Sequence, residues 1–431
     1  MDTVKIALIG FGTIGTGVAR ILLENAEHIG RTTGKRVELA CICDKDITRD
    51  RGLALPTGLL TDDLEKVMAD PSISIAIELI GGLEPARSIV LKLLESGKHV
   101  ITANKALLAT HGTEIFNAAR KNGKTVAFEA AVGGGIPIIN AVSTALQANE
   151  LKSLQAIVNG TCNFILTQME EHGTDYATAV REAQRLGYAE ADPTMDVDGT
   201  DTVQKLAILA HLGFGVDISW RDIPKTGIDT VDAIDIFYAN QLGYRIKLLA
   251  VADATDDGIE LYVSPTLVKR HTPVASVRDA FNIVRVVGHA VGEVCMIGRG
   301  AGEMPTASAV VGDLIDTILG RTAITFQTLK LWAKDRYSRP VKNPSEIYGK
   351  NYLRFQVEDR PGVLADITGL FGKHGVSISS VLQQENETDT DDPVMLIIMT
   401  HECREGDILD AIEKIDALDS VRSRTVRMRV E

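Results

Sequence analysis

The sequence predicts an α/β protein with a doubly wound parallel sheet, a second α+β domain with a largely antiparallel sheet, and a small ferredoxin-like domain. In the N-terminal part, short apolar runs rich in β-branched residues alternate with helical segments, which is typical of β-α-β crossovers. In the middle, apolar runs follow one another with glycine and proline between them, as in antiparallel sheets. The C-terminal segments have the order β-α-β-β-α-β. Three domains also agree with a length of 431 residues.

The first domain is predicted to cover residues 1–132. It begins with a strand over 3–9, a glycine-rich turn and a helix over 14–25 that contains no proline. The strands are almost continuously apolar, as expected where helices cover both faces of a parallel sheet. A segment rich in glycine, threonine and charge, 27–35, is expected to be a loop. Further strands are predicted at 37–43, 73–79, 99–102 and 125–128, and the clearest helices at 85–96 and 107–121.

The pattern changes at the GGGIP segment, where a second domain over 133–302 is predicted to begin. A helix, a strand and several helices come first, and the later apolar runs are punctuated by glycine and proline. A helix over 307–318 lies in a segment, 303–338, that is expected to complete the first domain. The strand-like runs of the second domain are 244–252, 259–267, 280–288 and 291–297.

The third domain is predicted over 352–431. It follows a linker over 339–351 that contains Pro340, Pro344 and Gly349. Its alternation of apolar runs predicts a split β-α-β unit of the ferredoxin-like type. Its strands are expected at 352–357, 377–383, 394–400 and 421–430, and its helices at 363–374 and 408–415.

Composition excludes several classes of protein. The 45 basic and 58 acidic side chains give a net charge of −13, which argues against a nucleic-acid-binding surface. No apolar run approaches the roughly 18 to 20 residues that cross a bilayer. The first residues run directly into a strand and do not have the pattern of a secretory signal. Five scattered cysteines suit a reducing compartment, so a cytoplasmic protein is expected.

A glycine motif follows the first strand and opens the first helix. Gly10, Gly12 and Gly15 form G-x-G-x-x-G in the setting that a dinucleotide-binding Rossmann domain requires. The first glycine permits a tight turn, the second lets the backbone approach a pyrophosphate, and the third brings the helix close to the sheet. A merely structural turn is the alternative. The predicted cofactor loop consists of Gly10, Phe11, Gly12, Thr13, Ile14 and Gly15.

The acid that reads the ribose is predicted to be Asp44, at the end of the second strand. It lies 34 residues beyond the first glycine, and the predicted loop over 27–35 explains the excess over the usual spacing. Asp44 would hydrogen-bond a ribose hydroxyl and repel a 2′-phosphate, whereas the adjacent Lys45 would attract that phosphate. The residues therefore leave the choice between NAD and NADP open.

Asn104 and Lys105 follow the strand over 99–102, at the edge where doubly wound folds bind ligands. A lysine is electrostatically unfavourable at the start of a helix, which favours a functional role for Lys105. A solvated lysine is the alternative.

The segment over 187–205 is the most informative. Glu190, Asp192, Asp196, Asp198 and Asp201 would repel one another unless a cation or hydrogen-bond donors relieve the charge. A calcium loop fails, since a lysine would stand at the twelfth position, where a bidentate glutamate is needed. The ammonium group of an amino-acid substrate fits better. Asp201 and Lys205 are four residues apart and share one helix face; a capped helix with a surface ion pair is the alternative.

Three further segments contain candidate site residues. Glu129, with the carbonyls of the glycine-rich turn after it, has the character of a monovalent-cation site, and a plain turn is the alternative. Thr161 joins a strand to a helix, where its hydroxyl and nearby N–H groups could meet a carboxylate. The segment over 298–314, a glycine loop that enters a helix, is a candidate to return to the cofactor. No histidine pair has metal-ligand spacing, and no nucleophile elbow is present.

Together these segments resemble homoserine dehydrogenase. The matching stretches, in family order over about residues 4–320, are GFGTIG, TANKALL, EAAVGGGIPI, NGTCNFI, GYAEADPTMDVDGTDTVQKLAIL and GAGEMPTASAVVGDL. The segment VEDRPGVLADITGLFGKHGVSI resembles an ACT domain, a small amino-acid-sensing module. Since no aspartate-kinase region precedes the first strand, the monofunctional form is expected.

The resemblance implies NAD(P)-dependent interconversion of L-homoserine and L-aspartate 4-semialdehyde, in threonine, methionine and isoleucine biosynthesis. It places the catalytic lysine on Lys205, as proton donor and acceptor, and a second important lysine on Lys105. The acids that bind homoserine fall on Glu190 and Asp201, with Asp196 as a further contributor. The implied sodium ligands are Glu129, Val132, Gly134 and Ile136, and the implied positions near the cofactor include Gly187 and Gly302.

The resemblance also implies regulation and assembly. L-threonine is the expected effector of the ACT domain, and a homodimer or homotetramer is expected because ACT modules commonly pair. Neither a nucleic acid nor a membrane is an expected partner. Two alternatives stay open: an amino-acid-responsive regulatory protein with a non-catalytic dehydrogenase-like domain, and a different oxidoreductase on the same scaffold.

Overall fold

The computed structural model describes residues 2–333, 338–383 and 393–431. Contacts divide the chain into two compact units, each of which is described by itself. Within the described residues, none of the helices combines the length and the apolar character that spanning a bilayer requires. The first unit consists of Met1–Lys152, Gln204–Asp222 and Phe281–Arg339, and the second of Ser153–Val203, Ile223–Ala280 and Pro340–Glu431.

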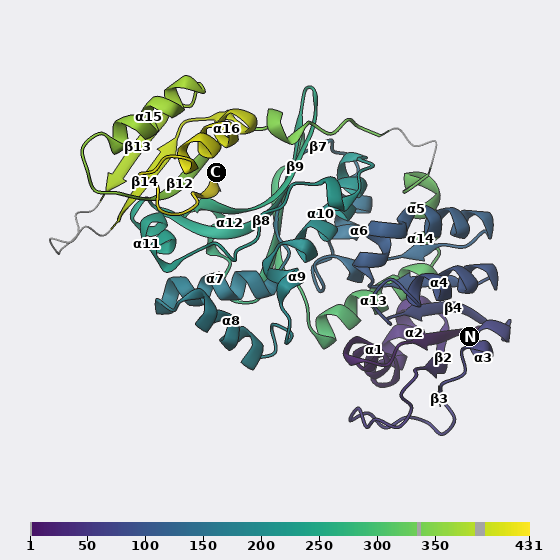
Figure 1. Ribbon diagram of the computed structural model, residues 1–431. Coiled ribbons are helices and arrows are strands. Elements are labelled where there is room, and N and C mark those ends of the chain that lie inside the picture. Colours follow the sequence, from purple (N-terminus) through teal and green to yellow (C-terminus); the bar gives the residue numbers. More distant parts are fainter. Residues whose placement is uncertain (1, 334–337, 384–392) are drawn as a thin grey trace. The chain divides into compact units, whose positions relative to one another are not determined.

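The first unit contains a six-stranded sheet in the order β3-β2-β1-β4-β5-β6. Figure 1 labels its strands β2, β3 and β4. Every pairing in it is parallel, and the order reverses between β1 and β4. This is the strand order of a Rossmann domain, so the predicted doubly wound sheet is confirmed. The strands are β1 (Thr3–Ile9), β2 (Arg36–Cys43), β3 (Leu60–Thr61), β4 (Ile73–Glu78), β5 (His99–Thr102) and β6 (Val126–Ala127).

Five helices connect these strands, and one of them corrects a prediction. The segment over 27–35, expected to be a loop, is mostly helix α2, which buries Ile29 and ends at Gly34 with φ of +67°. The other residues of α2 are small or polar, and one large apolar residue is too few to show the helical spacing on which the prediction depends. The helices are α1 (Thr13–Glu24), α2 (Ala26–Thr33), α3 (Leu64–Ala69), α4 (Ala86–Glu95) and α5 (Lys105–Lys121).

Helix α13 (Glu303–Ile318) packs on the Rossmann sheet although it is distant in sequence. Its side chains Ala307, Val310 and Leu314 belong to the same buried cluster as Ile6 and Leu8 of β1. Glycine at position 17 permits the approach of α1, because a Cβ there would lie 2.8 Å from Cγ of Glu303. This packing supports the expected return of 303–338 to the first domain; 334–337 lie outside the described residues.

The rest of the first unit consists of helical segments of different lengths and one hairpin. The hairpin pairs β10 and β11 in antiparallel register. Helix α10 begins in the second unit and continues into the first. The elements are η1 (Glu129–Ala131), α6 (Ile138–Asn140), η2 (Ala141–Ala145), α10 (Thr200–Phe214), η3 (Trp220–Asp222), β10 (Phe281–Gly288), β11 (Gly292–Arg299) and α14 (Arg321–Leu329).

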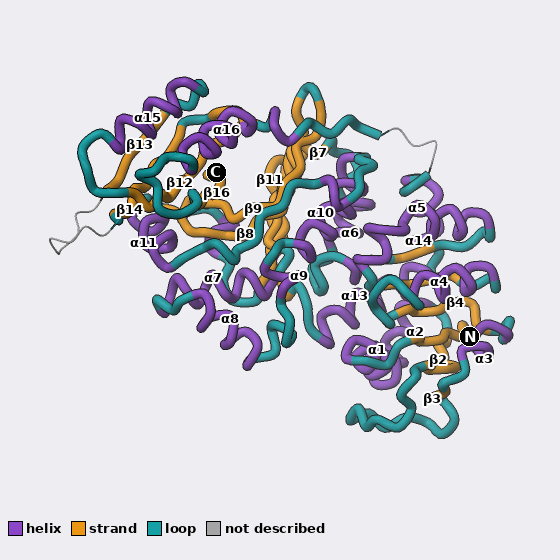
Figure 2. Tube along the Cα trace, in the orientation of Figure 1, coloured by secondary structure: helices purple, strands orange, loops and turns teal. Residues whose placement is uncertain are grey.

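The second unit is built on a sheet with the order β7-β8-β9-β16-β12-β14-β13, which Figure 2 shows in orange. All of its pairings are antiparallel except the one between β9 and β16. The expected antiparallel sheet is therefore present. Its first elements are β7 (Leu151–Ile157), α7 (Gly160–His172), α8 (Tyr176–Arg185), α9 (Thr194–Val197), α11 (Ala233–Gln241), β8 (Tyr244–Thr255), β9 (Gly258–Lys269) and α12 (Pro273–Ser276).

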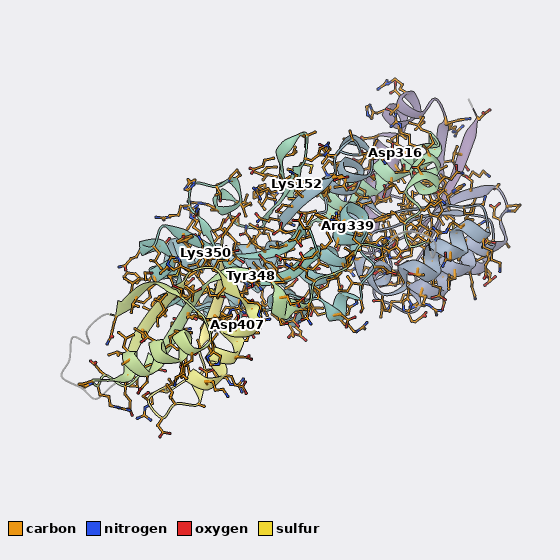
Figure 3. All side chains as sticks on the ribbon, turned by 90° about the horizontal axis from the view of Figure 1, so that it is seen from above. Lys152, Asp316, Arg339, Tyr348, Lys350 and Asp407 are labelled. Carbon is orange, nitrogen blue, oxygen red and sulfur yellow. The ribbon has the colours of Figure 1, made fainter. Side chains whose placement is uncertain are left out.

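The C-terminal elements form the predicted ferredoxin-like module, in the strand order β16-β12-β14-β13. Figure 3 labels Tyr348 and Lys350 at the start of its first strand and Asp407 on its last helix. The final strand is shorter than the expected 421–430. The elements are η4 (Pro344–Glu346), β12 (Tyr348–Val357), α15 (Val363–Lys373), β13 (Ile378–Gln383), β14 (Val394–Thr400), β15 (Cys403–Arg404), α16 (Glu405–Asp416) and β16 (Val426–Val430).

This module shares a sheet with the preceding domain. Strand β16 pairs with β9 in parallel, with Arg429 opposite Thr266 and Val430 opposite Leu267. The predicted linker is attached to β9, because Lys342 forms an ion pair with Glu260 of that strand at 3.0 Å. The ACT-like module and the strands before it are thus parts of one continuous sheet, a connection that proline and glycine content does not reveal.

Candidate active site

The glycine loop has the geometry that a pyrophosphate requires. A Cβ on Gly10 would lie 2.6 Å from the Leu79 carbonyl, and one on Gly15 would lie 2.2 Å from the Gly10 carbonyl, so both positions exclude side chains. A Cβ on Gly12 would meet no atom within 4 Å, which leaves open space beside the backbone. Among the described residues, no side chain caps the N-terminus of α1. Its first N–H groups are therefore available to an anion.

Asp44 anchors this loop. Its carboxylate accepts the backbone N–H of Phe11 at 2.5 Å and that of Asp46 at 2.9 Å. The guanidinium of Arg51 lies 3.4 Å from the same carboxylate, donates to the Phe11 carbonyl, and sits 4.8 Å above the Phe11 ring. Lys45 is exposed. Sequence reasoning missed Arg51, because it stands in an irregular segment with no spacing rule to single it out.

The carboxyl ends of β4 and β5 carry a second group of polar side chains. Asn104 caps α5 by accepting the Leu107 N–H at 3.1 Å, and its amide donates to the Gly82 carbonyl at 2.6 Å. Lys105 is the first residue of that helix and is half-buried. Glu78, which the sequence analysis did not select, is fully buried at the end of β4 and accepts the Thr102 hydroxyl at 2.7 Å. Burial raises its pKa.

The aspartates of the acid-rich segment over 187–205 fall into two groups. Asp192 and Asp198 each have partners of their own, whereas Asp196 and Asp201 share one. Asp192 accepts the backbone N–H and hydroxyl of Thr194. Asp198 accepts those of Thr200 at 2.8 Å and faces the Lys225 ammonium at 2.7 Å, which together hold its pKa below the usual value despite burial. These two acids are thus engaged by neighbouring threonines and, for Asp198, by a lysine.

Asp196 and Asp201 meet at one side chain. The amide nitrogen of Asn159 lies 2.8 Å from the Asp196 carboxylate and 2.9 Å from the Asp201 carboxylate. Asp201 is 6% exposed and stands in the first turn of α10. Lys205 follows one turn later on the same helix and is half-buried. Two carboxylates are thus held together, with a primary amine on the helix that carries one of them.

The first turn of α7 holds the acid-rich segment at two further points. The Thr161 hydroxyl donates to the Tyr188 carbonyl at 2.6 Å. The Cys162 thiol donates to the Asp196 carbonyl at 3.2 Å. Glu190 is exposed in the same segment, as is Gly187, which has φ of +77°. Thr161 therefore positions the chain, and its oxygen keeps lone pairs for a further donor.

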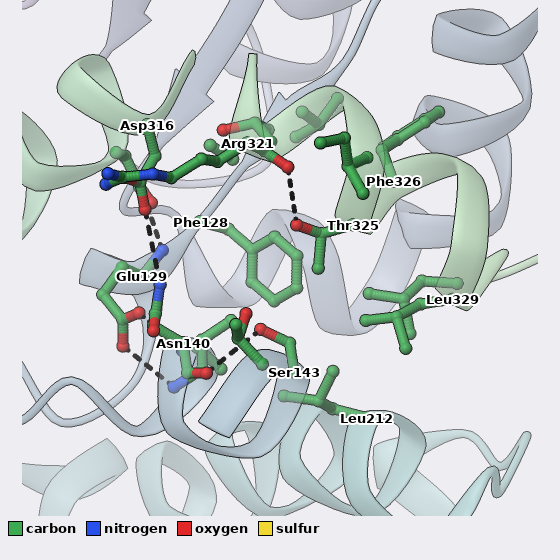
Figure 4. A pocket seen from close by; sticks show the side chains of 18 of the residues that line it. Phe128, Glu129, Asn140, Ser143, Leu212, Asp316, Arg321, Thr325, Phe326 and Leu329 are labelled. Carbon is green, nitrogen blue, oxygen red and sulfur yellow. Dashed lines mark hydrogen bonds and ion pairs between the residues drawn. The ribbon is translucent and has the colours of Figure 1, made fainter. Parts of the chain in front are cut away.

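Glu129 is a buried acid with backbone partners. It is 8% exposed, and its carboxylate accepts the N–H groups of Ile139 at 2.9 Å and Asn140 at 2.7 Å. Its own N–H donates to Asp313 at 2.8 Å. Burial raises the pKa of Glu129 to about 7, and burial beside Glu129 raises that of Asp313 as well. Figure 4 shows Glu129 and Asn140 at one end of a cavity of about 260 Å³ that also contacts Phe128.

The turn after Glu129 approaches the segment before α13. Gly133 and Gly134 have positive φ angles of 78° and 53°. A Cβ on Gly134 would lie 2.4 Å from the Gly300 carbonyl, so only glycine fits. No group of three or more His, Cys, Asp or Glu side chains with a metal-binding arrangement occurs in the described parts of the chain. A cation here would depend on Glu129 and carbonyl oxygens, such as those of Val132, Gly134 and Ile136.

Comparisons with known proteins agree with this geometry. Family models match residues 137–315 (homoserine dehydrogenase), 10–129 (homoserine dehydrogenase, NAD binding domain) and 351–420 (ACT domain). A homoserine dehydrogenase of Pseudomonas aeruginosa is 43% identical, with 100% of this chain and 99% of the relative covered. The crystal structure of a homoserine dehydrogenase from Thiobacillus denitrificans is 42% identical, with a TM-score of 0.92 and coverage of 100% and 99%.

A more distant solved structure is a hyperthermophilic archaeal homoserine dehydrogenase in complex with NADPH. It is 26% identical, with a TM-score of 0.61, and the match covers 74% of this chain and 98% of that one. The matches to catalytic and NAD-binding models do not support the alternative of a non-catalytic regulatory protein. The chain belongs to the homoserine dehydrogenase family.

Proposed function

We propose that Lys205 is the proton donor and acceptor of the homoserine dehydrogenase reaction, the interconversion of L-homoserine and L-aspartate 4-semialdehyde. The observation that carries this assignment is the placement of Lys205 one turn after Asp201 on α10, with Asp201 already paired to Asp196 through Asn159. Paired carboxylates suit a substrate ammonium group, and a nearby amine suits the oxygen that is reduced.

The chemistry divides between cofactor and protein. A bound nicotinamide supplies the hydride in the reducing direction. The Lys205 ammonium stabilises the negative charge that develops on the carbonyl oxygen and then protonates it. In the oxidising direction its neutral amine takes the proton of the homoserine hydroxyl. Lys105 is proposed as a second catalytic lysine, supported by its position after β5, at the sheet edge where doubly wound folds bind ligands.

The substrate is held by its charged groups in this proposal. Asp196, Asp201 and Glu190 bind the ammonium group, since all three lie in one segment, between α8 and the start of α10. Thr161 contributes to the binding of the carboxylate group through its backbone N–H in the first turn of α7, since its hydroxyl proton is already donated to the Tyr188 carbonyl.

The cofactor is NADP(H) in this proposal. Gly10 to Gly15 and the N-terminus of α1 bind the pyrophosphate, supported by the space beside Gly12. Asp44 is engaged by Phe11 and by the Arg51 guanidinium, which offsets its repulsion of a 2′-phosphate; Arg51 and Lys45 add two positive charges beside it. The archaeal relative that binds NADPH also favours this choice. Further cofactor contacts are proposed for Asn104, Lys105, Gly187 and Gly302.

Sodium is the proposed monovalent cation, bound by the Glu129 carboxylate and the carbonyls of Val132, Gly134 and Ile136. The donor set suits a hard cation, because every proposed ligand is an oxygen. The raised pKa of Glu129 supports the assignment, since it marks a buried carboxylate beside which the described residues place no basic side chain that lowers its pKa.

Regulation, assembly and place in metabolism complete the proposal. L-threonine inhibits the enzyme through the ACT domain, with the turn over 359–363 as its binding region. The protein forms a homodimer or homotetramer in the cytoplasm and serves threonine, methionine and isoleucine biosynthesis. The domain division into 1–132 with 303–338, 133–302 and 352–431 is part of the proposal.

The assay that tests the reaction follows NADPH and NADH consumption with L-aspartate 4-semialdehyde, and NADP⁺ and NAD⁺ reduction with L-homoserine. Turnover of both substrates is expected, with NADPH preferred. Folded protein that turns over neither substrate with either cofactor would contradict the proposal. Equal activity with NADH and NADPH would contradict only the assignment of the cofactor.

A further inference from the structure

Asn159 uses every polar atom of its side chain. Its Oδ1 accepts the N–H of Cys162 at 2.8 Å and so caps α7. Its Nδ2 lies 2.8 Å from Oδ1 of Asp196 and 2.9 Å from Oδ2 of Asp201. The side chain is 4% exposed, so these partners replace water. One amide therefore links a helix cap to two carboxylates from different helices, α9 and α10.

The partners fix the orientation of the amide. A flipped amide would set Oδ1 against two carboxylates and Nδ2 against an N–H group, so each of the three hydrogen bonds would become a repulsion. Asn159 can therefore offer only its two N–H groups to the acids. Cys162 strengthens the arrangement from the same turn, because its thiol donates to the Asp196 carbonyl.

The shared amide reduces the electrostatic repulsion between Asp196 and Asp201. Two carboxylates close together repel each other, and one of them normally takes up a proton. A neutral donor shared between them relieves that repulsion without cancelling either charge, as a lysine or arginine would. Asn159 thus holds the two acids close to each other without adding a charge of its own.

We infer that Asn159 is a positioning residue that holds the carboxyl groups of Asp196 and Asp201 together as one receptor for the ammonium group of homoserine. The inference rests on the proposed substrate role of the two acids. Asn159 itself touches neither substrate nor cofactor in this scheme.

Two substitutions separate this role from capping. Asn159→Ser and Asn159→Asp both keep an oxygen that can cap α7, and aspartate caps as well as asparagine does. Serine removes the shared amide, whereas aspartate replaces it with a third negative charge. The matched control is Asn343→Asp, which makes the same change at another helix cap, where Asn343 accepts the N–H of Ser345 at 3.1 Å and is exposed. Asp201→Asn tests the substrate role of the acid directly.

The measurements are KM and kcat for L-homoserine at saturating NADP⁺, the dissociation constant of NADP⁺, and the melting temperature. We expect the KM for homoserine to rise at least about tenfold in Asn159→Ser and further in Asn159→Asp, the loss expected when hydrogen bonds to charged groups are removed. The dissociation constant of NADP⁺ should change less than twofold. Asn343→Asp should behave as wild type.

The outcomes are distinguishable. If Asp201→Asn raises the KM and both Asn159 variants leave it unchanged, the inference is overturned and the substrate role stands. If Asp201→Asn leaves the KM unchanged, the proposed substrate role fails, and the inference fails with it even when Asn159 variants are impaired. If the two Asn159 variants lose melting temperature equally and change KM and kcat alike, Asn159 only stabilises the fold. A larger KM in Asn159→Asp than in Asn159→Ser, at similar melting temperatures, supports the inference.

Discussion

The guanidinium of Arg51 lies 3.4 Å from the carboxylate of Asp44, with side-chain exposures of 8% and 16%. Asp44 in turn accepts the N–H of Phe11 in the cofactor loop. The acid that a sequence rule assigns to the ribose is thus compensated by a basic side chain. A site with this arrangement repels a 2′-phosphate far less than a bare aspartate would.

Arg51→Ala should therefore change the choice of cofactor. We expect the ratio of kcat/KM for NADPH to that for NADH to fall at least about tenfold, because a charge-assisted hydrogen bond to phosphate is lost. The ratio corrects for any general damage to the loop, which Arg51 also contacts at the Phe11 carbonyl. Arg49→Ala, at an exposed neighbour, is the control. An equal loss with both cofactors would show that Arg51 only supports the loop.

Lys205→Ala should lower kcat by at least about a hundredfold, within the range for loss of general acid–base help. Lys121→Ala, an exposed lysine at the end of α5, should change kcat less than twofold. Steady-state rates in both directions, with the melting temperature measured for each variant, check this expectation. A loss below threefold would remove Lys205 from the proposed role.

Glu129 should make stability depend on pH. Its pKa is raised from 4.5 to about 7 in the folded protein, so between these values the unfolded chain releases its proton first. The free energy of unfolding should therefore fall as pH rises through this window. Asp313, whose pKa is also raised, acts in the same direction, so Glu129→Gln should reduce the slope without abolishing it.

Sodium adds a second test of Glu129. A cation binds the ionised carboxylate, so sodium should raise the melting temperature more above pH 7 than below it, relative to a tetramethylammonium buffer. Glu129→Gln should lose most of that increase. A sodium effect of the same size in the variant would exclude Glu129 as a ligand.

An ion pair between Asp235 and Arg354 joins α11 to β12, and its loss should reduce the stability of the fold. Asp235 is fully buried and accepts Nε of Arg354 at 2.8 Å and the Tyr352 hydroxyl at 2.9 Å. Asp235→Ala should lower the free energy of unfolding by about 3 to 5 kcal/mol, because Arg354, whose side chain is only 14% exposed, loses its partner. Asp232→Ala removes the cap of the same helix and should cost about 1 kcal/mol in urea unfolding. A smaller loss in Asp235→Ala than in Asp232→Ala would contradict this ranking.

Millimolar L-threonine should inhibit the full-length enzyme, and Gly362→Ala should relieve that inhibition. Gly362 precedes α15 with φ of +97°, which an alanine adopts only with strain, so the substitution should disturb the turn over 359–363. The basal rate should stay within twofold, and Gly375→Ala, at a similar φ of +71° beyond the same helix, is the control. Unchanged rates of the wild type with threonine would contradict threonine regulation.

The parts of the fold that were predictable depend on local rules. Gly10 and Gly15 follow a strand at fixed spacing, and Asp201 and Lys205 share a helix face because of helical periodicity. Arg51 escaped prediction because its segment is irregular and its contact with the cofactor loop, at Phe11, spans 40 residues. Helix α2 escaped it because most of its residues are polar. Asn159 carried a usable signal, since an asparagine between a strand and a helix is typical of an N-cap. Its bridge to two acids is tertiary, and no spacing rule contains it.

The pairing of β16 with β9 has a consequence for biosynthesis. Until the ribosome has produced Arg429 and Val430, the end of β9 at Thr266 and Leu267 lacks the partner that it has in the complete chain, and such a bare strand end invites association between nascent chains. Premature termination inside the regulatory module would therefore damage the enzyme by aggregation before it affected the response to any effector.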